Sequence, residues 1–140
     1  TPILLIFKNK LAMKVEVSNG ELLDKLTILE LKLTNITNVQ KLSNIQKEHD
    51  ELSPLADQLF DSYGEELKNL YKKLTEINSE LWTIEDDIRE CERNKDFGSD
   101  FVSLARAVYF TNDKRSDVKK AINLLTDSGL IEEKSYEDYE

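Results

Sequence analysis

The sequence is poor in the residues that make turns, cross-links and metal sites. Its 140 residues include four glycines, two prolines, one cysteine and one histidine. An all-β sandwich or barrel needs turn residues at every strand junction, so that class is disfavoured. The single cysteine excludes an internal disulfide and a multi-cysteine zinc site. The single histidine excludes the common di-iron helical bundle, which takes a Glu-x-x-His pair from each of two helices.

Positive charge is also scarce. The chain has 19 Lys and Arg residues against 28 Asp and Glu, a formal charge of −9. A surface that binds DNA or RNA by its phosphates needs concentrated positive charge, so we expect no nucleic-acid partner. The longest apolar run, residues 2–7, is too short for a signal peptide or a membrane span. We therefore expect a cytoplasmic protein with no membrane insertion.

The only methionine of the chain, Met13, marks the expected boundary between an N-terminal extension and the domain. Met13 stands directly before a helix-entry pattern, so we interpret residues 1–12 as an N-terminal extension upstream of the natural start. Residues 13–128 are then expected to form a single helical domain, and residues 129–140 an acidic C-terminal tail. The alternation of polar and apolar residues over 14–17 suits a short N-terminal strand.

Two segments predict N-terminal helices. Ser18 and Glu21 have the spacing of a capping box, and apolar residues at steps of three and four follow, which predicts a helix over 19–35. The stretch 35–39 is rich in Asn and β-branched residues and predicts a break. A second apolar pattern covers 42–52, and Pro54 suits the first position of a new helix with Ser53 as its cap.

The remaining helices form the strongest pattern in the sequence. From Leu67 to Cys91 apolar residues recur at alternating steps of three and four, the seam of a helix packed on another helix. Gly64 is expected to interrupt the helix before this seam. A turn over 94–98 separates it from a last helix that Ser99 caps and that runs to about Asp127, where Gly129 would supply a left-handed stop.

These patterns predict an all-α fold. A long antiparallel helical hairpin, made of residues 64–93 and 99–127, is packed against the helix at 19–35, and the N-terminal helices complete a small bundle. The long regular seam also predicts a homodimer, and other protein partners are compatible with so much helix surface.

All four arginines lie between residues 89 and 115, at the predicted hairpin. Arginine makes two-pronged contacts with carboxylates and phosphates, so the cluster indicates a buried ion-pair network or an anion site. In the first interpretation Glu85 and Asp86 pair with Arg106 and Arg115 and fix the register of the hairpin. In the second, one or two arginines bind an acidic ligand or a partner's carboxylate. A magnesium site built on residues 21–24 and 85–87 is a third interpretation.

The last helix contributes further polar residues where its apolar spacing calls for core. No cofactor or metal is assigned, since the sequence has no phosphate-binding glycine loop, catalytic triad or zinc motif. The candidate ligand-binding residues are Glu85, Arg89, Arg106, Asn112, Asp113, Arg115 and Lys119, with Glu21, Asp24, Lys25 and Lys134 as contributors.

Four separated segments resemble, in order, a family of small bacterial and phage proteins known only as a domain of unknown function. They are SNGELLDKLTILE at 18–30, LWTIEDDIR at 81–89, FVSLARAVYFTNDKR at 101–115 and IEEKSY at 131–136. The resemblance implies an association with glycosyltransferase and cell-envelope glycan genes, which is context and no mechanism.

We expect a non-enzymatic helical interaction or assembly module, since the chain has extensive helix surface and no catalytic group. The alternative is a small-molecule enzyme or sensor that binds an acidic sugar, a nucleotide or a sugar phosphate at the arginine cluster. A pocket lined by Arg89, Arg106, Asn112 and Arg115 would favour that alternative.

Overall fold

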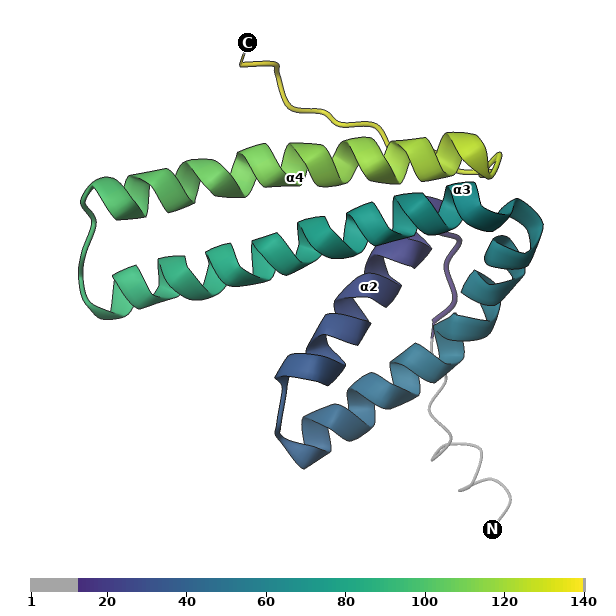
Figure 1. The fold of residues 1–140 in the computed structure, drawn as a ribbon, viewed down its shortest axis with the longest axis horizontal. Helices are drawn as coiled ribbons and strands as arrows, with labels where there is room; N and C mark the ends of the chain where they lie inside the picture. The colour runs from purple at the N-terminus through teal and green to yellow at the C-terminus, as the bar shows by residue number, and fades with distance from the viewer. Residues whose placement is uncertain (1–12, 140) are drawn as a thin grey trace.

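A computed structural model describes residues 13–139 of the chain (Figure 1). It contains three packed helices: α2 (Asn19–Asn35), α3 (Val39–Arg93) and α4 (Ser99–Leu125). The predicted all-α fold is confirmed. The predicted strand over 14–17 is wrong, because residues 13–139 contain no strand with which it could pair, and Val15 is exposed. The extension proposed for residues 1–12 lies outside the described residues.

Helix α2 begins and ends where the sequence predicts. The backbone N–H of Glu21 donates to the Ser18 hydroxyl at 3.1 Å, which satisfies one of the free donors of the first turn. The break after Asn35 is three residues long, and Asn38 caps the next helix by accepting from the Lys41 N–H at 3.0 Å. The predicted break at 35–39 is therefore confirmed.

The predicted helix start at Pro54 is wrong, since α3 passes through this residue without interruption. A proline inside a helix removes one backbone hydrogen bond and crowds the preceding turn. The apolar residues around it explain why the helix continues. Leu52 and Leu59 pack against the core and Ala56 is fully buried, so tertiary packing outweighs the local preference.

Gly64 makes the real interruption of α3. Its φ of 60° and ψ of −139° lie in a region that residues with a Cβ rarely adopt. Figure 1 shows that α3 bends sharply and runs back on itself, so that its first half pairs with α2 and its second half with α4. The predicted hairpin of residues 64–93 with the last helix is therefore formed by the second half of α3 and α4.

Both hairpin helices end in a residue with positive φ. Lys95 (φ 52°) follows α3, and Asp127 (φ 49°) follows α4. After α4 the Ser128 N–H donates to the Asn123 carbonyl at 2.9 Å, which completes a Schellman-type end. The predicted left-handed stop at Gly129 is wrong. The left-handed residue is Asp127, two positions before Gly129, because the hydrogen bond from the Ser128 N–H to the Asn123 carbonyl ends the helix there.

The core lies where α2 crosses the hairpin. Its buried apolar side chains come from all three helices: Leu23, Leu26, Ala56, Leu67, Leu74 and Ile122. After α4 the chain turns back, and the tail runs along that helix (Figure 1). None of the helices described within residues 13–139 is long and apolar enough to cross a membrane.

Candidate functional site

Asp24 is the centre of a buried polar network between the helices. Its side chain is 1% exposed, and the guanidinium of Arg115 in α4 contacts both of its carboxylate oxygens. The Arg115 Nε donates to Oδ1 at 2.9 Å. The hydrogen bond to Asp24 is the main cause that raises the pKa of Arg115, against the opposing effect of burial. The arginine therefore stays charged and compensates the buried carboxylate.

Helix α3 completes this network from the other side. The Asn78 amide donates to Asp24 Oδ1 at 2.9 Å and to the Thr27 hydroxyl oxygen at 2.7 Å. The Thr27 hydroxyl donates to the Asp24 carbonyl at 2.6 Å. A buried carboxylate is tolerated only when its acceptors are satisfied. This network therefore fixes how α2, α3 and α4 meet.

Lys119 forms a second ionic centre beside the first. Its Nζ lies 2.6 Å from Glu21 Oε2 of α2 and 3.3 Å from Glu132 Oε1 of the tail. Burial lowers the pKa of the Lys119 ammonium, but the hydrogen bond to Glu21 and the nearby carboxylates outweigh it, so the pKa is raised overall. One lysine thus connects α4 to α2 and to the C-terminal tail.

The first turn of α2 docks on the last turns of α4. The Gly20 N–H donates to Asn123 Oδ1 at 2.6 Å, and the Asn19 amide donates to the Thr126 hydroxyl oxygen at 2.9 Å. A Cβ at position 20 would lie only 2.5 Å from the Lys119 carbonyl oxygen. The contact is therefore close enough to require glycine.

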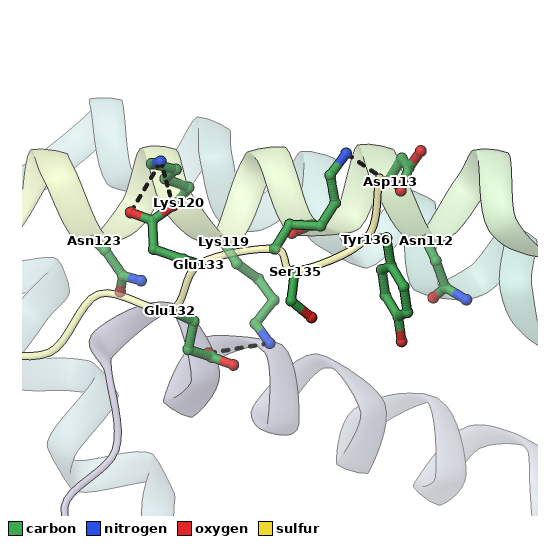
Figure 2. A pocket seen from close by; sticks show the side chains of 11 residues that line it. Asn112, Asp113, Lys119, Lys120, Asn123, Glu132, Glu133, Ser135 and Tyr136 are labelled. Carbon is green, nitrogen blue, oxygen red and sulfur yellow. Dashed lines mark hydrogen bonds and ion pairs between the residues drawn. The ribbon is translucent and has the colours of Figure 1, made fainter. Parts of the chain in front are cut away.

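The C-terminal tail, residues 130–139, runs along α4 as a strap held by ion pairs. Lys120 binds Glu133 at 2.9 Å, and Lys134 lies 3.6 Å from Asp113. The Tyr139 hydroxyl donates to Asp113 at 2.6 Å. Figure 2 shows the tail running along α4, from Glu132 near Asn123 to Tyr136 near Asn112. The tail therefore makes one wall of a cavity.

This strap cavity has a volume of about 290 Å³. Its polar lining comes from α4 and from the tail, and includes Asn112, Ser116, Lys119, Asn123, Glu132 and Ser135 (Figure 2). The small-molecule interpretation requires a pocket lined by Arg89, Arg106, Asn112 and Arg115. Of these four residues, only Asn112 lines the strap cavity.

The candidate residues at the outer end of the hairpin lie apart from this cavity. Arg89 pairs with Glu85 of its own helix, and both side chains are exposed. Arg106 donates to the Tyr109 hydroxyl oxygen at 3.4 Å and lies 5.6 Å from the centre of the Phe110 ring. The predicted pairing of Glu85 and Asp86 with Arg106 and Arg115 is wrong, because Arg115 reaches α2 and Glu85 is paired within α3.

The predicted site residues thus fall into two groups. Around the junction of α2, α4 and the tail the structure gathers Glu21, Asp24, Asn112, Asp113, Arg115, Lys119 and Lys134. Away from that junction lie Glu85, Arg89 and Arg106 at the outer hairpin, and Lys25, which faces Glu48 of α3 at 3.7 Å. Three of the four resembling segments therefore contribute to the junction.

Sequence reasoning missed the amides and hydroxyls of the network, namely Asn78, Thr27 and Asn123. In the sequence, the only feature that points to a role for Asn78 is its position next to the apolar seam. The proposed magnesium site would use Glu21 and Asp24, but these carboxylates are already paired with Lys119 and Arg115. Residues 13–139 hold no group of three His, Cys, Asp or Glu side chains arranged for a metal ion.

The family model of DUF6165, a family of unknown function, matches residues 13–139. The chain belongs to this family. No curated protein and no solved structure matches it. The four segments that carry the resemblance all lie inside the DUF6165 match, so the polar junction and the outer hairpin are both parts of the family's domain.

Proposed function

We propose that this protein is a non-enzymatic assembly module that pairs with a second copy of itself through the outer part of the α3–α4 hairpin. The observation that carries the proposal is an apolar face with no covering helix. Helix α2 contacts the hairpin at Asn78 and Arg115 and then leaves it to pack on the first half of α3 (Figure 1). Beyond that level no other described helix packs on α3 and α4, and the tail contacts α4 through Tyr139 at Tyr109, Phe110 and Asp113.

Helix periodicity identifies the uncovered face. Residues four, seven and eleven positions after Asn78 lie on the side of α3 that α2 occupies. On α4 the residues seven and fourteen positions before Arg115 and the residue fourteen positions before Lys119 lie on that side. This outer face consists of Trp82, Glu85, Arg89, Phe101, Ala105 and Val108. The four apolar members are only half buried, so part of their surface remains to be covered.

The charges on the outer face favour a second copy as the occupant. Glu85 and Arg89 stand one helical turn apart with 44% and 63% of their side chains exposed. When two α3 helices meet antiparallel, centred between these residues, Glu85 of each copy faces Arg89 of the other. The surface is thus complementary to itself, as a twofold interface requires.

Charge-reversal variants test this assembly. Glu85→Lys places a lysine against Arg89 of the other copy, and Arg89→Glu places a glutamate against Glu85 of the other copy. Like charges then face each other twice in each homodimer, so each variant alone is expected to sediment as a monomer. An equimolar mixture restores both attractive pairs and is expected to sediment as a dimer. Trp82 is the only tryptophan, so its emission is expected to shift to the red when the dimer dissociates on dilution.

Glu90→Lys is the matched control. It also removes an exposed ion pair within α3, that with Arg93, but it lies about 100° further round the helix. It is expected to remain a dimer. A wild-type protein that sediments as a monomer at high concentration, or a mixture of the two variants that stays monomeric, would overturn the proposal.

A further inference from the structure

Asn123 carries a buried hydrogen-bond donor that has no partner. The residue is 1% exposed, and its Nδ2 makes no hydrogen bond with any described residue. The side chain cannot exchange its two ends, because Oδ1 is already held by the Gly20 N–H at 2.6 Å. The free group is therefore the NH₂. Leaving a buried donor without an acceptor is unfavourable, so we expect this NH₂ group to bind an acceptor from outside the chain.

That donor belongs to the lining of the strap cavity. Asn123 forms one end of the cavity, and Asn112 and Tyr136 lie toward its other end, as Figure 2 shows. Ser116, Ser135 and Asn112 also line it, and none of their side chains has a hydrogen-bond partner among residues 13–139. The cavity thus offers several polar groups that are ready to donate and to accept.

The charges in the lining compensate each other. Three lysines face three carboxylates: Lys119 with Glu132, Lys120 with Glu133 and Lys134 with Asp113. A ligand with a net charge would have to break one of these pairs and leave its partner uncompensated. The lining therefore disfavours anions and cations, and its amides and hydroxyls suit an uncharged polar molecule.

We infer that the strap cavity is a binding site for a small uncharged ligand rich in hydroxyl and carbonyl groups. A volume of about 290 Å³ is at the lower limit of ligand pockets, and it suits a molecule of the size of one sugar ring. Asn123 Nδ2 donates to an oxygen of this ligand, and the serine hydroxyls and the Asn112 amide bind its other polar groups. The inference is independent of the proposed assembly, which uses the outer face.

The test compares sugars of one ring size that differ in charge. Glucose and N-acetylglucosamine serve as the uncharged probes, and glucose 6-phosphate and glucuronate as the charged ones. Binding is followed by ligand-observed NMR and by the thermal unfolding midpoint at tens of millimolar sugar. At least one uncharged sugar is expected to bind and to raise the midpoint, and the charged sugars are expected to bind more weakly.

Two variants connect the binding to the cavity. Asn123→Asp keeps the acceptor for Gly20 and replaces the free donor by an acceptor, so affinity is expected to fall about tenfold or more. Ser116→Met fills the cavity and leaves the Gly20 contact in place, which keeps the test valid if the buried aspartate impairs folding. Ser103→Met, at an exposed position of the same helix, is the matched control and is expected to bind as wild type.

Three outcomes would overturn the inference. The first is that neither uncharged sugar binds, which would leave an ordered water as the acceptor for Asn123. The second is that the charged sugars bind as tightly as the uncharged ones or more tightly. The third is that a folded Ser116→Met variant binds like the Ser103→Met control.

Discussion

The guanidinium of Arg115 holds the carboxylate of Asp24 with two of its nitrogens and joins segments that are 91 residues apart in sequence. Asp24 is buried to 1% exposure and Arg115 retains 29%. The carboxylate also accepts from Asn78 of α3. A single side chain of α2 is therefore the point at which all three helices are fixed relative to one another.

Replacing Arg115 by methionine is expected to destabilise the fold. Arg115→Met leaves the Asp24 carboxylate buried with only the Asn78 amide to compensate it, and breaking a buried pair on one side costs about 3 kcal/mol. Urea unfolding at neutral pH, followed by helical circular dichroism, measures this loss.

The double variant Asp24→Leu/Arg115→Met separates the ion pair from the packing of the arginine stem. With both charges removed, no carboxylate remains buried, so the double variant is expected to be more stable than Arg115→Met alone. Equal stabilities of the two variants would show that the loss arises from packing and not from the uncompensated charge.

How far the sequence predicts this fold is shown by its helix ends. The spacing from Leu67 to Cys91 and the cap at Ser18 are local features, so α2 and the second half of α3 were predicted almost to the residue. Pro54 is also a local feature, but the helix start that it predicts is wrong, because the burial of Ala56 and its neighbours keeps this segment helical. Local preference predicts an element only where packing does not oppose it.

The candidate site was predicted in part for a similar reason. The polar interruption of the last helix correctly marks Arg115 and Lys119 as residues that need partners. Their partners, Asp24 and Glu21, lie on a helix about a hundred residues away, and spacing within the hairpin gives no information on it. The spacing therefore predicts the acids across the hairpin, Glu85 and Asp86, as partners of the arginines. Asn123 gave no signal, because an amide in an amphipathic helix is ordinary until its burial is known.

Gly20→Ala is expected to separate α2 from α4. The added methyl group would stand 2.5 Å from the Lys119 carbonyl oxygen and 3.0 Å from Asn123 Oδ1, and the backbone atom cannot rotate away. Overpacking of this kind costs about 1–3 kcal/mol. Thermal and urea unfolding of the purified variant measure it.

Gly129→Ala is the control for that substitution. A Cβ at position 129 meets nothing within 4 Å, and the residue does not have a positive φ. Its stability is expected to stay within about 0.5 kcal/mol of wild type. If Gly20→Ala is equally harmless, the close approach of the two helices is not what holds α2 in place.

The docking of the tail is expected to depend on pH through Glu132. Burial acts to raise the pKa of this carboxyl, but the charge of Lys119 and the hydrogen bonds from Lys119 and Ser18 outweigh it, so the pKa lies below its ordinary value of 4.5. A lowered carboxyl pKa means that docking is favoured fully above about pH 4.5, and that this contribution is lost as the pH falls through the lower value of the docked state. Backbone ¹⁵N relaxation of residues 130–139 reports how firmly the tail is held, and the tail is expected to be more ordered at pH 7 than below pH 4.5. Glu132→Gln removes the charge at every pH, so its tail is expected to be more mobile than that of wild type at pH 7 and to change less in acid. A wild-type tail that is equally ordered at pH 7 and in acid would show that the Lys119 and Ser18 contacts do not hold it.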